Sequence, residues 1–156
     1  MTAPTGPTSR CKETVDVLYS FFYLQDGGQA WLDDDSTPPS PSGGNKLTAT
    51  GKDWVSIVSE AQDHVAGIQL EAWPTAPPRQ DDWEISEDFQ VALTTGEVVP
   101  VGVTMGPSEE EIIVGPPGTY AGRVYSRGRQ DTRNAREENL QIPDGLEQYL
   151  VQFWPA

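Results

Sequence analysis

The chain has 156 residues, of which 24 are aspartate or glutamate and 10 are lysine or arginine, giving a formal net charge of −14. A surface this acidic repels nucleic acid and anionic membranes, so we expect neither as a partner, and it attracts cationic proteins. The length predicts one domain with its own core, and the five Trp, five Tyr and four Phe argue against a disordered chain.

The N-terminal residues 1–12 are rich in Pro, Thr and Ser, which predicts a flexible arm ahead of a single domain over residues 13–156. The chain shows no secretory signal pattern and no apolar run long enough to span a membrane. Cys11 is the one cysteine, so an intramolecular disulfide is excluded. We therefore expect a cytoplasmic protein, or one built into a particle that is assembled in the cytoplasm.

The first predicted strand is Val15–Gln25, which carries apolar residues on both of its alternating faces and is therefore expected to be buried on both. Asp26-Gly27-Gly28 predicts a turn, and Asp33–Asn45 predicts a long polar loop. Clusters of Gly, Pro and Asp then separate five shorter strand candidates, which are Trp54–Ser59, Gly67–Trp73, Glu84–Leu93, Val98–Val103 and Glu111–Val114.

The remaining elements follow the same pattern. Thr95-Gly96 predicts a hairpin between the third and fourth of the shorter strands. A Pro-Pro-Gly turn leads into the strand Thr119–Ser126, and Leu146–Trp154 is the final strand. The best helical candidate, Arg133–Gln141, has helix-favouring residues but lacks an apolar stripe.

About eight short strands with Gly and Pro turns predict an all-β fold, an antiparallel two-sheet sandwich of the jelly-roll type. The strands Val15–Gln25 and Leu146–Trp154 carry the densest apolar content. We expect both to be central, and whether they are adjacent is left open.

No residue pattern predicts an enzyme. His64 is the one histidine, and although Ser59 is near it in sequence, no G-x-S-x-G turn that would present a nucleophile is present. The paired carboxylates lie side by side in polar segments, where solvent keeps them ionised, rather than across a cleft. The chain also lacks the spacing of a calcium loop, a zinc site or a phosphate-binding loop, so we expect no cofactor and no metal.

Two tryptophans stand directly beside acidic residues, a combination typical of the anchor residues in protein interfaces. The alternatives are that the acids only keep the protein soluble and that each Trp belongs to the core. The candidate partner-binding residues are Trp31, Asp33, Asp34, Asp35, Asp81, Asp82, Trp83, Glu109, Glu110 and Glu111.

Five of the ten cationic residues lie between Arg123 and Arg136, where a single aspartate opposes them. Because arginine binds phosphate and carboxylate in a bidentate manner, Arg123, Arg127 and Arg129 are candidate contacts for an anion. The alternative is that these arginines pair with the protein's own surplus carboxylates.

Pro117–Tyr120, Arg123–Tyr125 and Tyr149–Pro155 resemble segments of an uncharacterised family of small actinobacterial proteins, which implies a shared β fold. More distantly, the order of motifs is similar to the competence protein J family. The matching elements are Gln25-Asp26 at the end of an aromatic strand, Trp31 soon after it, the strand Gly118–Tyr120, and the closing Tyr149–Phe153. A Pro/Ser loop replaces the Gly-Phe segment of that family, whose founding member inhibits a DNA-entry nuclease.

The sequence thus predicts a non-enzymatic acidic domain that binds a cationic protein, as an inhibitor or immunity factor of a nuclease or toxin. The alternative is a structural or accessory module, such as a virion decoration protein. Self-association is left open.

Overall fold

The computed structural model describes residues 6–27, 47–102, 106–107 and 111–156, and all structural statements below concern these residues. Its elements are β1 (Ser9–Leu18), β2 (Phe21–Asp26), β3 (Thr48–Gly51), β4 (Trp54–Val58), β5 (Asp63–Ala72), β6 (Ile85–Leu93), β7 (Glu97–Gly102), β8 (Gly106–Pro107), β9 (Ile112–Ile113), β10 (Gly118–Arg127), α2 (Arg129–Glu137) and β11 (Gln148–Pro155).

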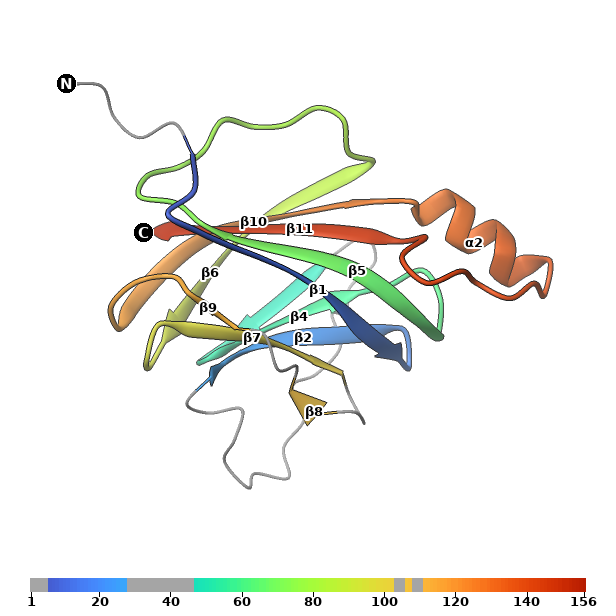
Figure 1. Cartoon of the computed structure of the whole chain (residues 1–156), viewed down its shortest axis with the longest axis horizontal. Coiled ribbons are helices and arrows are strands. Elements are labelled where there is room, and N and C mark those ends of the chain that lie inside the picture. The colour runs from blue at the N-terminus through green and yellow to red at the C-terminus, as the bar shows by residue number, and fades with distance from the viewer. Residues whose placement is uncertain (1–5, 28–46, 103–105, 108–110) are drawn as a thin grey trace.

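The strands form one sheet in the order β3-β4-β2-β1-β5-β11-β10-β6, and β7 pairs with β2, β8 and β9 beside this path. The sheet curls into a nearly closed, barrel-like shape, with α2 at one end and β9 at the other (Figure 1). The predicted all-β class is confirmed. The two-sheet sandwich is not confirmed, and the pairing is not purely antiparallel because β5 and β11 run parallel.

Side chains close the gap between the two end strands, β3 and β6. The Glu87 carboxylate on β6 accepts hydrogen bonds from the Leu47 amide at 3.2 Å, the Thr48 amide at 2.7 Å and the Thr48 hydroxyl. Further along, the Asp53 amide in the β3–β4 turn donates to the Ala92 carbonyl at 2.8 Å. The Asp53 carboxylate in return accepts from the amide and hydroxyl of Thr94, at 2.6 and 2.7 Å. Both sheet edges are thereby covered, which protects them from pairing with another chain.

A third carboxylate fixes the chain where β6 ends. Asp26, fully buried at the end of β2, accepts from the Thr95 amide at 2.8 Å, the Thr95 hydroxyl at 2.7 Å and the Gly96 amide at 3.1 Å. The predicted turn at Thr95-Gly96 is present, but it does not join a hairpin. β6 pairs with β10, whereas β7 pairs with β2. The hydrogen bonds to Asp26 hold the Thr95-Gly96 turn at the end of β2, so β7 begins beside β2 rather than beside β6.

The predicted strand Val15–Gln25 is instead the meeting point of two strands. Tyr19 and Ser20 both have positive φ, 60° and 69°, and turn the chain between β1 and β2, where Leu18 pairs with Phe21. Such a two-residue turn usually carries Asn-Gly, so Tyr-Ser gives no sequence signal for it. The expected burial on both faces holds for β2, because Phe22 packs in the main core while Phe21 packs with Val99 and Val101 on the other face.

Two other expectations change, and one open question is answered. The arm predicted over residues 1–12 is too long, since Ser9 already pairs with Ala72 and the Thr8 amide donates to the Ala72 carbonyl at 2.7 Å. β1 and β11 are central in the sheet, as expected, and they are not adjacent because β5 lies between them. The helix begins at Arg129 rather than Arg133, and Glu84 caps it by accepting from the amides of Arg129 and Gln130 at 3.0 and 3.3 Å.

Replacing Glu87 by Gln tests the closure between β3 and β6. The amide side chain presents one acceptor and one donor to groups that are all donors, so the unfolding free energy should fall by about 1–3 kcal/mol. Urea unfolding measures this loss. Glu138→Gln is the matched control, because the Glu138 side chain is exposed. An equal unfolding midpoint for the two variants would contradict the role given to Glu87.

Candidate protein-binding surfaces

The residues predicted to bind a partner are only partly within the described structure. Asp81, Asp82, Trp83 and Glu111 are described, as are the three arginines proposed for an anion. The remaining predicted residues, Trp31, Asp33, Asp34, Asp35, Glu109 and Glu110, lie outside the described residues.

The described acids fall at opposite ends of β6. Asp81–Trp83 directly precede the start of β6 at Ile85, next to the capped end of α2, whereas the Glu111 side chain lies beside Gly27, near the turn after Leu93. A nine-residue strand is about 26 Å long at ~3.3 Å per residue. The structure therefore does not bring these acids into one patch.

We name the first area the Gly27 surface, formed by Glu97, Glu111 and Ile113 around the buried Gly27. A Cβ atom placed on Gly27 would lie 3.0 Å from Oε2 of Glu111 and 3.2 Å from Oε2 of Glu97. Glu97 pairs with Ile113 across β7 and β9, and Ile113 is 62% exposed. Sequence reasoning missed Glu97, because its position beside Glu111 depends on the register of β7 with β9.

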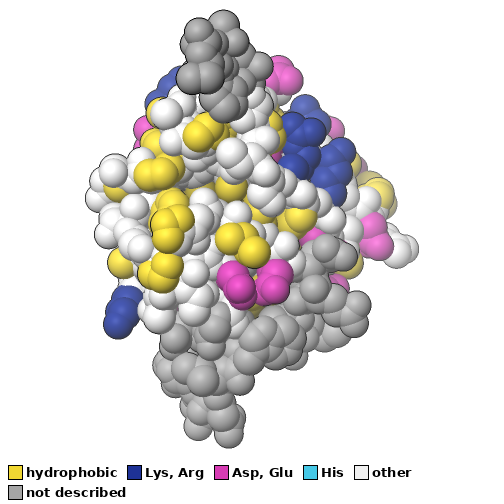
Figure 2. Space-filling model, turned by 60° about the vertical axis from the view of Figure 1, so that its left-hand side comes forward, with side chains coloured by type: hydrophobic (Ala, Val, Ile, Leu, Met, Phe, Trp, Pro, Cys, Tyr) yellow, Lys and Arg dark blue, Asp and Glu magenta, His cyan; other side chains and the backbone are white. Residues whose placement is uncertain are grey.

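Figure 2 shows how apolar and acidic side chains are distributed over one face of the molecule. Hydrophobic side chains form a band on this face, and acidic side chains lie just below it. Apolar contact area and negative charge are thus presented together.

The second area, Asp81–Trp83, differs in that its aromatic residue is already engaged. The Trp83 ring is half-buried, lies 5.8 Å from the Tyr125 ring, and is covered by the Arg127 guanidinium at 4.3 Å. Its indole nitrogen donates to the Gln80 side chain at 2.9 Å. Asp81 and Asp82 are exposed beside it.

Two of the three candidate anion-binding arginines are engaged inside the protein. Arg123 is buried, donates to Asp88 at 2.9 Å and lies 5.2 Å from the Trp154 ring. Arg129 is buried and donates to Glu60 at 3.3 Å. Arg127 is the exposed one of the three.

The arginines of α2 fasten this helix to the loop after β4. Arg129 and Arg133 both bond the Glu60 carboxylate, at 3.3 and 3.1 Å, and Arg136 donates to the Glu60 carbonyl at 2.7 Å. The hydrogen bond from Arg133 is the largest influence that lowers the pKa of Glu60 below its ordinary value. A helix without an apolar stripe is thus held by ion pairs.

Beneath this helix the fold brings together Ser59, His64 and Glu147, all buried. The Ser59 hydroxyl donates to Glu147 at 2.6 Å, so its oxygen accepts from Nε2 of His64 at 2.8 Å. In a hydrolase the acid would hold Nδ1 and leave Nε2 free to take the serine proton. Here Glu147 lies on the Nε2 side, 3.6 Å away, and Nδ1 has no hydrogen-bond partner within the described structure. The geometry is that of a structural network.

Tyr149 completes this network. Its hydroxyl donates to Glu147 at 2.5 Å and accepts from Arg129 at 3.1 Å. Burial, and after it the negative charge of Glu147, raises the pKa of Tyr149 well above 10, so the hydroxyl keeps its proton. Glu147 therefore accepts hydrogen bonds from the Ser59 and Tyr149 hydroxyls and from the Glu60 amide at 2.9 Å, and it forms an ion pair with Arg129 at 3.9 Å.

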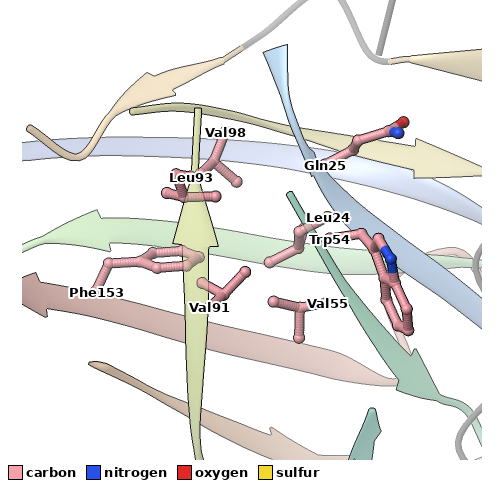
Figure 3. Close-up of a pocket in the computed structure, with 8 residues that line it drawn as sticks. All are labelled: Leu24, Gln25, Trp54, Val55, Val91, Leu93, Val98 and Phe153. Carbon is pink, nitrogen blue, oxygen red and sulfur yellow. The ribbon is translucent and has the colours of Figure 1, made fainter. Parts of the chain in front are cut away.

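One pocket in the described part of the molecule offers no room for a ligand. It is lined by Leu24, Gln25, Trp54, Val55, Val91, Leu93, Val98 and Phe153 (Figure 3), and its cavity volume is about 0 Å³. Ligand pockets typically measure ~300–1,000 Å³. Among the described residues, moreover, no three acidic, Cys or His side chains gather to hold a metal ion, and no helix is long and apolar enough to cross a membrane.

Known structures share this fold. ComJ from Bacillus subtilis, described as an inhibitor of the DNA-degrading activity of NucA, matches with a TM-score of 0.62 and 12% identity over 94% of this chain and 96% of ComJ. The protein described as crocagin biosynthetic gene J matches with a TM-score of 0.58 and 13% identity over 95% of this chain and 97% of that one. No sequence profile of a known family and no curated protein sequence matches the chain.

His64 makes stability depend on pH. Burial lowers its pKa from the ordinary 6.5, outweighing the negative charges of Glu147, Asp63 and Asp144, which act to raise it. Below pH ~6.5 the unfolded chain binds a proton that the folded protein does not, so the free energy of unfolding falls as pH drops toward the folded pKa, by at most ~1.4 kcal/mol per pH unit.

Urea unfolding of wild type and His64→Gln between pH 8 and pH 5 measures this effect, since the other titrating groups are common to both proteins. We expect the stability advantage of wild type over His64→Gln to shrink as pH falls. An advantage that grows toward pH 5 would instead show a stabilising ion pair between His64 and Glu147.

Proposed function

We propose that this protein is a non-enzymatic inhibitor that binds a cationic nuclease. The observation that carries the proposal is the fold shared with ComJ, which extends over nearly the whole length of both chains. Fold alone does not determine function, so the proposal also depends on what the surface of this chain offers.

The net charge of −14 supports this function. A nuclease groove is positive because it holds a polyanion, and an acidic protein can occupy that groove in place of DNA. Opposite charges on the two proteins also raise the rate of association.

The internal pairing of the arginines gives further support. Arg123, Arg129 and Arg133 bind the protein's own carboxylates. They contribute little positive potential to the surface, and exposed acids such as Asp81 and Asp82 remain uncompensated by them. The field that a partner meets is therefore negative.

The test begins with an extract of the source organism that is separated on a cation-exchange column. DNA degradation is measured in each fraction with and without the purified protein. We expect near-stoichiometric inhibition of at least one retained fraction at about 50 mM salt, weakening at least ~10-fold by about 300 mM because the Debye length shortens.

Polyglutamate at equal total charge is the control for unspecific inhibition by a polyanion. If no fraction is inhibited, or if polyglutamate inhibits as well as the protein, the proposed function is wrong.

A further inference from the structure

We propose that the partner docks on the Gly27 surface, with one of its arginine or lysine side chains bound by the carboxylates of Glu97 and Glu111, which lie against the buried Gly27. This inference rests on the proposed function for the identity of the partner as a cationic nuclease. It adds which surface is used and which chemical group is recognised.

The first step is the convergence of two carboxylates on one point. Oε2 of Glu111 and Oε2 of Glu97 lie 3.0 and 3.2 Å from the position that a Cβ atom of residue 27 would take, so the two oxygens are at most 6.2 Å apart, the sum of these distances. Two negative charges this close repel each other, and a cation between them removes the repulsion. Gly27 is buried beneath these two side chains, and a side chain in its place would press on both carboxylates.

The second step is the lack of a cation supplied by the described part of the chain. Neither Glu97 nor Glu111 takes part in an ion pair among the described residues. The described arginines with ion pairs bind elsewhere: Arg10 to Glu71, Arg79 and Arg123 to Asp88, Arg129 and Arg133 to Glu60, and Arg136 to Glu137. Within the described part of the chain, no ion pair therefore neutralises the two charges at the Gly27 surface.

The third step is the apolar residue between the acids. Val98 and Ile112, a pair across β7 and β9, are both buried, so their neighbours Glu97 and Ile113 point outward together. Ile113 is 62% exposed, and Glu111, which directly precedes β9, is exposed as well. An arginine or lysine carries its charge on an aliphatic stem, so Ile113 can contact the stem while the carboxylates bind the charge.

The other acidic area is less suited to this role. Arg127 already covers the Trp83 ring, and Arg79, two residues before Asp81, is exposed. A cationic partner would have to displace Arg127 to reach the Trp83 ring, and the positive charges of Arg127 and Arg79 would repel it. This difference makes Asp81 and Asp82 a matched control.

The main experiment compares two double variants that each raise the net charge by four units. In Glu97→Lys/Glu111→Lys we expect inhibition of the nuclease fraction to weaken by roughly 100-fold or more, because close interfacial charge pairs are strongly coupled. In Asp81→Lys/Asp82→Lys we expect a change below roughly 10-fold, from the loss of general attraction alone. Thermal unfolding of each variant verifies that it is folded.

A variant with unchanged charge tests the placement of the Glu97 and Glu111 carboxylates separately from the net charge. Gly27→Gln would press a side chain against the two carboxylates, and we expect it to weaken inhibition by roughly 10-fold or more by displacing them from where they bind the incoming group. Gln80→Gly is its neutral control in the other acidic area, with no effect expected.

The outcomes separate the two proposals. Inhibition that survives in Glu97→Lys/Glu111→Lys, or is lost equally in both double variants, overturns the Gly27 surface and leaves the proposed function standing. If the wild-type protein inhibits no nuclease, the proposed function fails. A nuclear magnetic resonance titration with hexaarginine then decides the surface.

In that titration the largest amide shifts should fall on Gly27, Glu97, Glu111 and Ile113, and Glu97→Gln/Glu111→Gln should abolish them. Shifts centred on Asp81–Trp83, or no localised shifts, would overturn the inference.

Discussion

The fold depends on three carboxylates that accept hydrogen bonds from threonines. Asp26, Asp53 and Glu87 each accept hydrogen bonds from both the amide and the hydroxyl of one threonine, namely Thr95, Thr94 and Thr48. These bonds join β3 and β4 to β6 and tie the turn after β6 to β2. Without them the sheet would end in two open edges. The same turn delivers β7 to β2, and β7 with β9 carries Glu97, Ile113 and the neighbouring Glu111.

The large negative charge is therefore not one undifferentiated property. One set of acids closes the barrel, and a second set, led by Glu60 and Asp88, holds the arginines. A third set, Glu97 and Glu111 at the Gly27 surface, neither closes the barrel nor pairs with an arginine among the described residues. Solubility explains surface acids in general. It does not explain two carboxylates that converge over a buried glycine beside an exposed isoleucine, and on this arrangement we base the proposal of a cationic partner.

The sequence predicted what local patterns determine, because alternation and turn residues place most strands, from Trp54 to Trp154, within a few residues. The sequence-based prediction failed where contacts between residues distant in the sequence determine the path of the chain. Tyr19-Ser20 carries no turn signal, and Asp26 diverts the chain at Thr95-Gly96 away from a hairpin. The pairing of the arginines was foreseen as an alternative, whereas Glu147, distant in sequence from Ser59 and His64, was not. Glu97 joins Glu111 through strand register, which no local pattern encodes.

The most direct test of this account is amide hydrogen exchange of the protein, free and bound to the nuclease that we propose it inhibits. The account predicts slowed exchange at Gly27, at Glu97–Gly102 and at Glu111–Ile113, with the start of β6 and α2 unchanged. Slowed exchange confined to Asp81–Trp83 or to α2 would contradict it. Such a result would show that the partner uses the opposite end of the barrel.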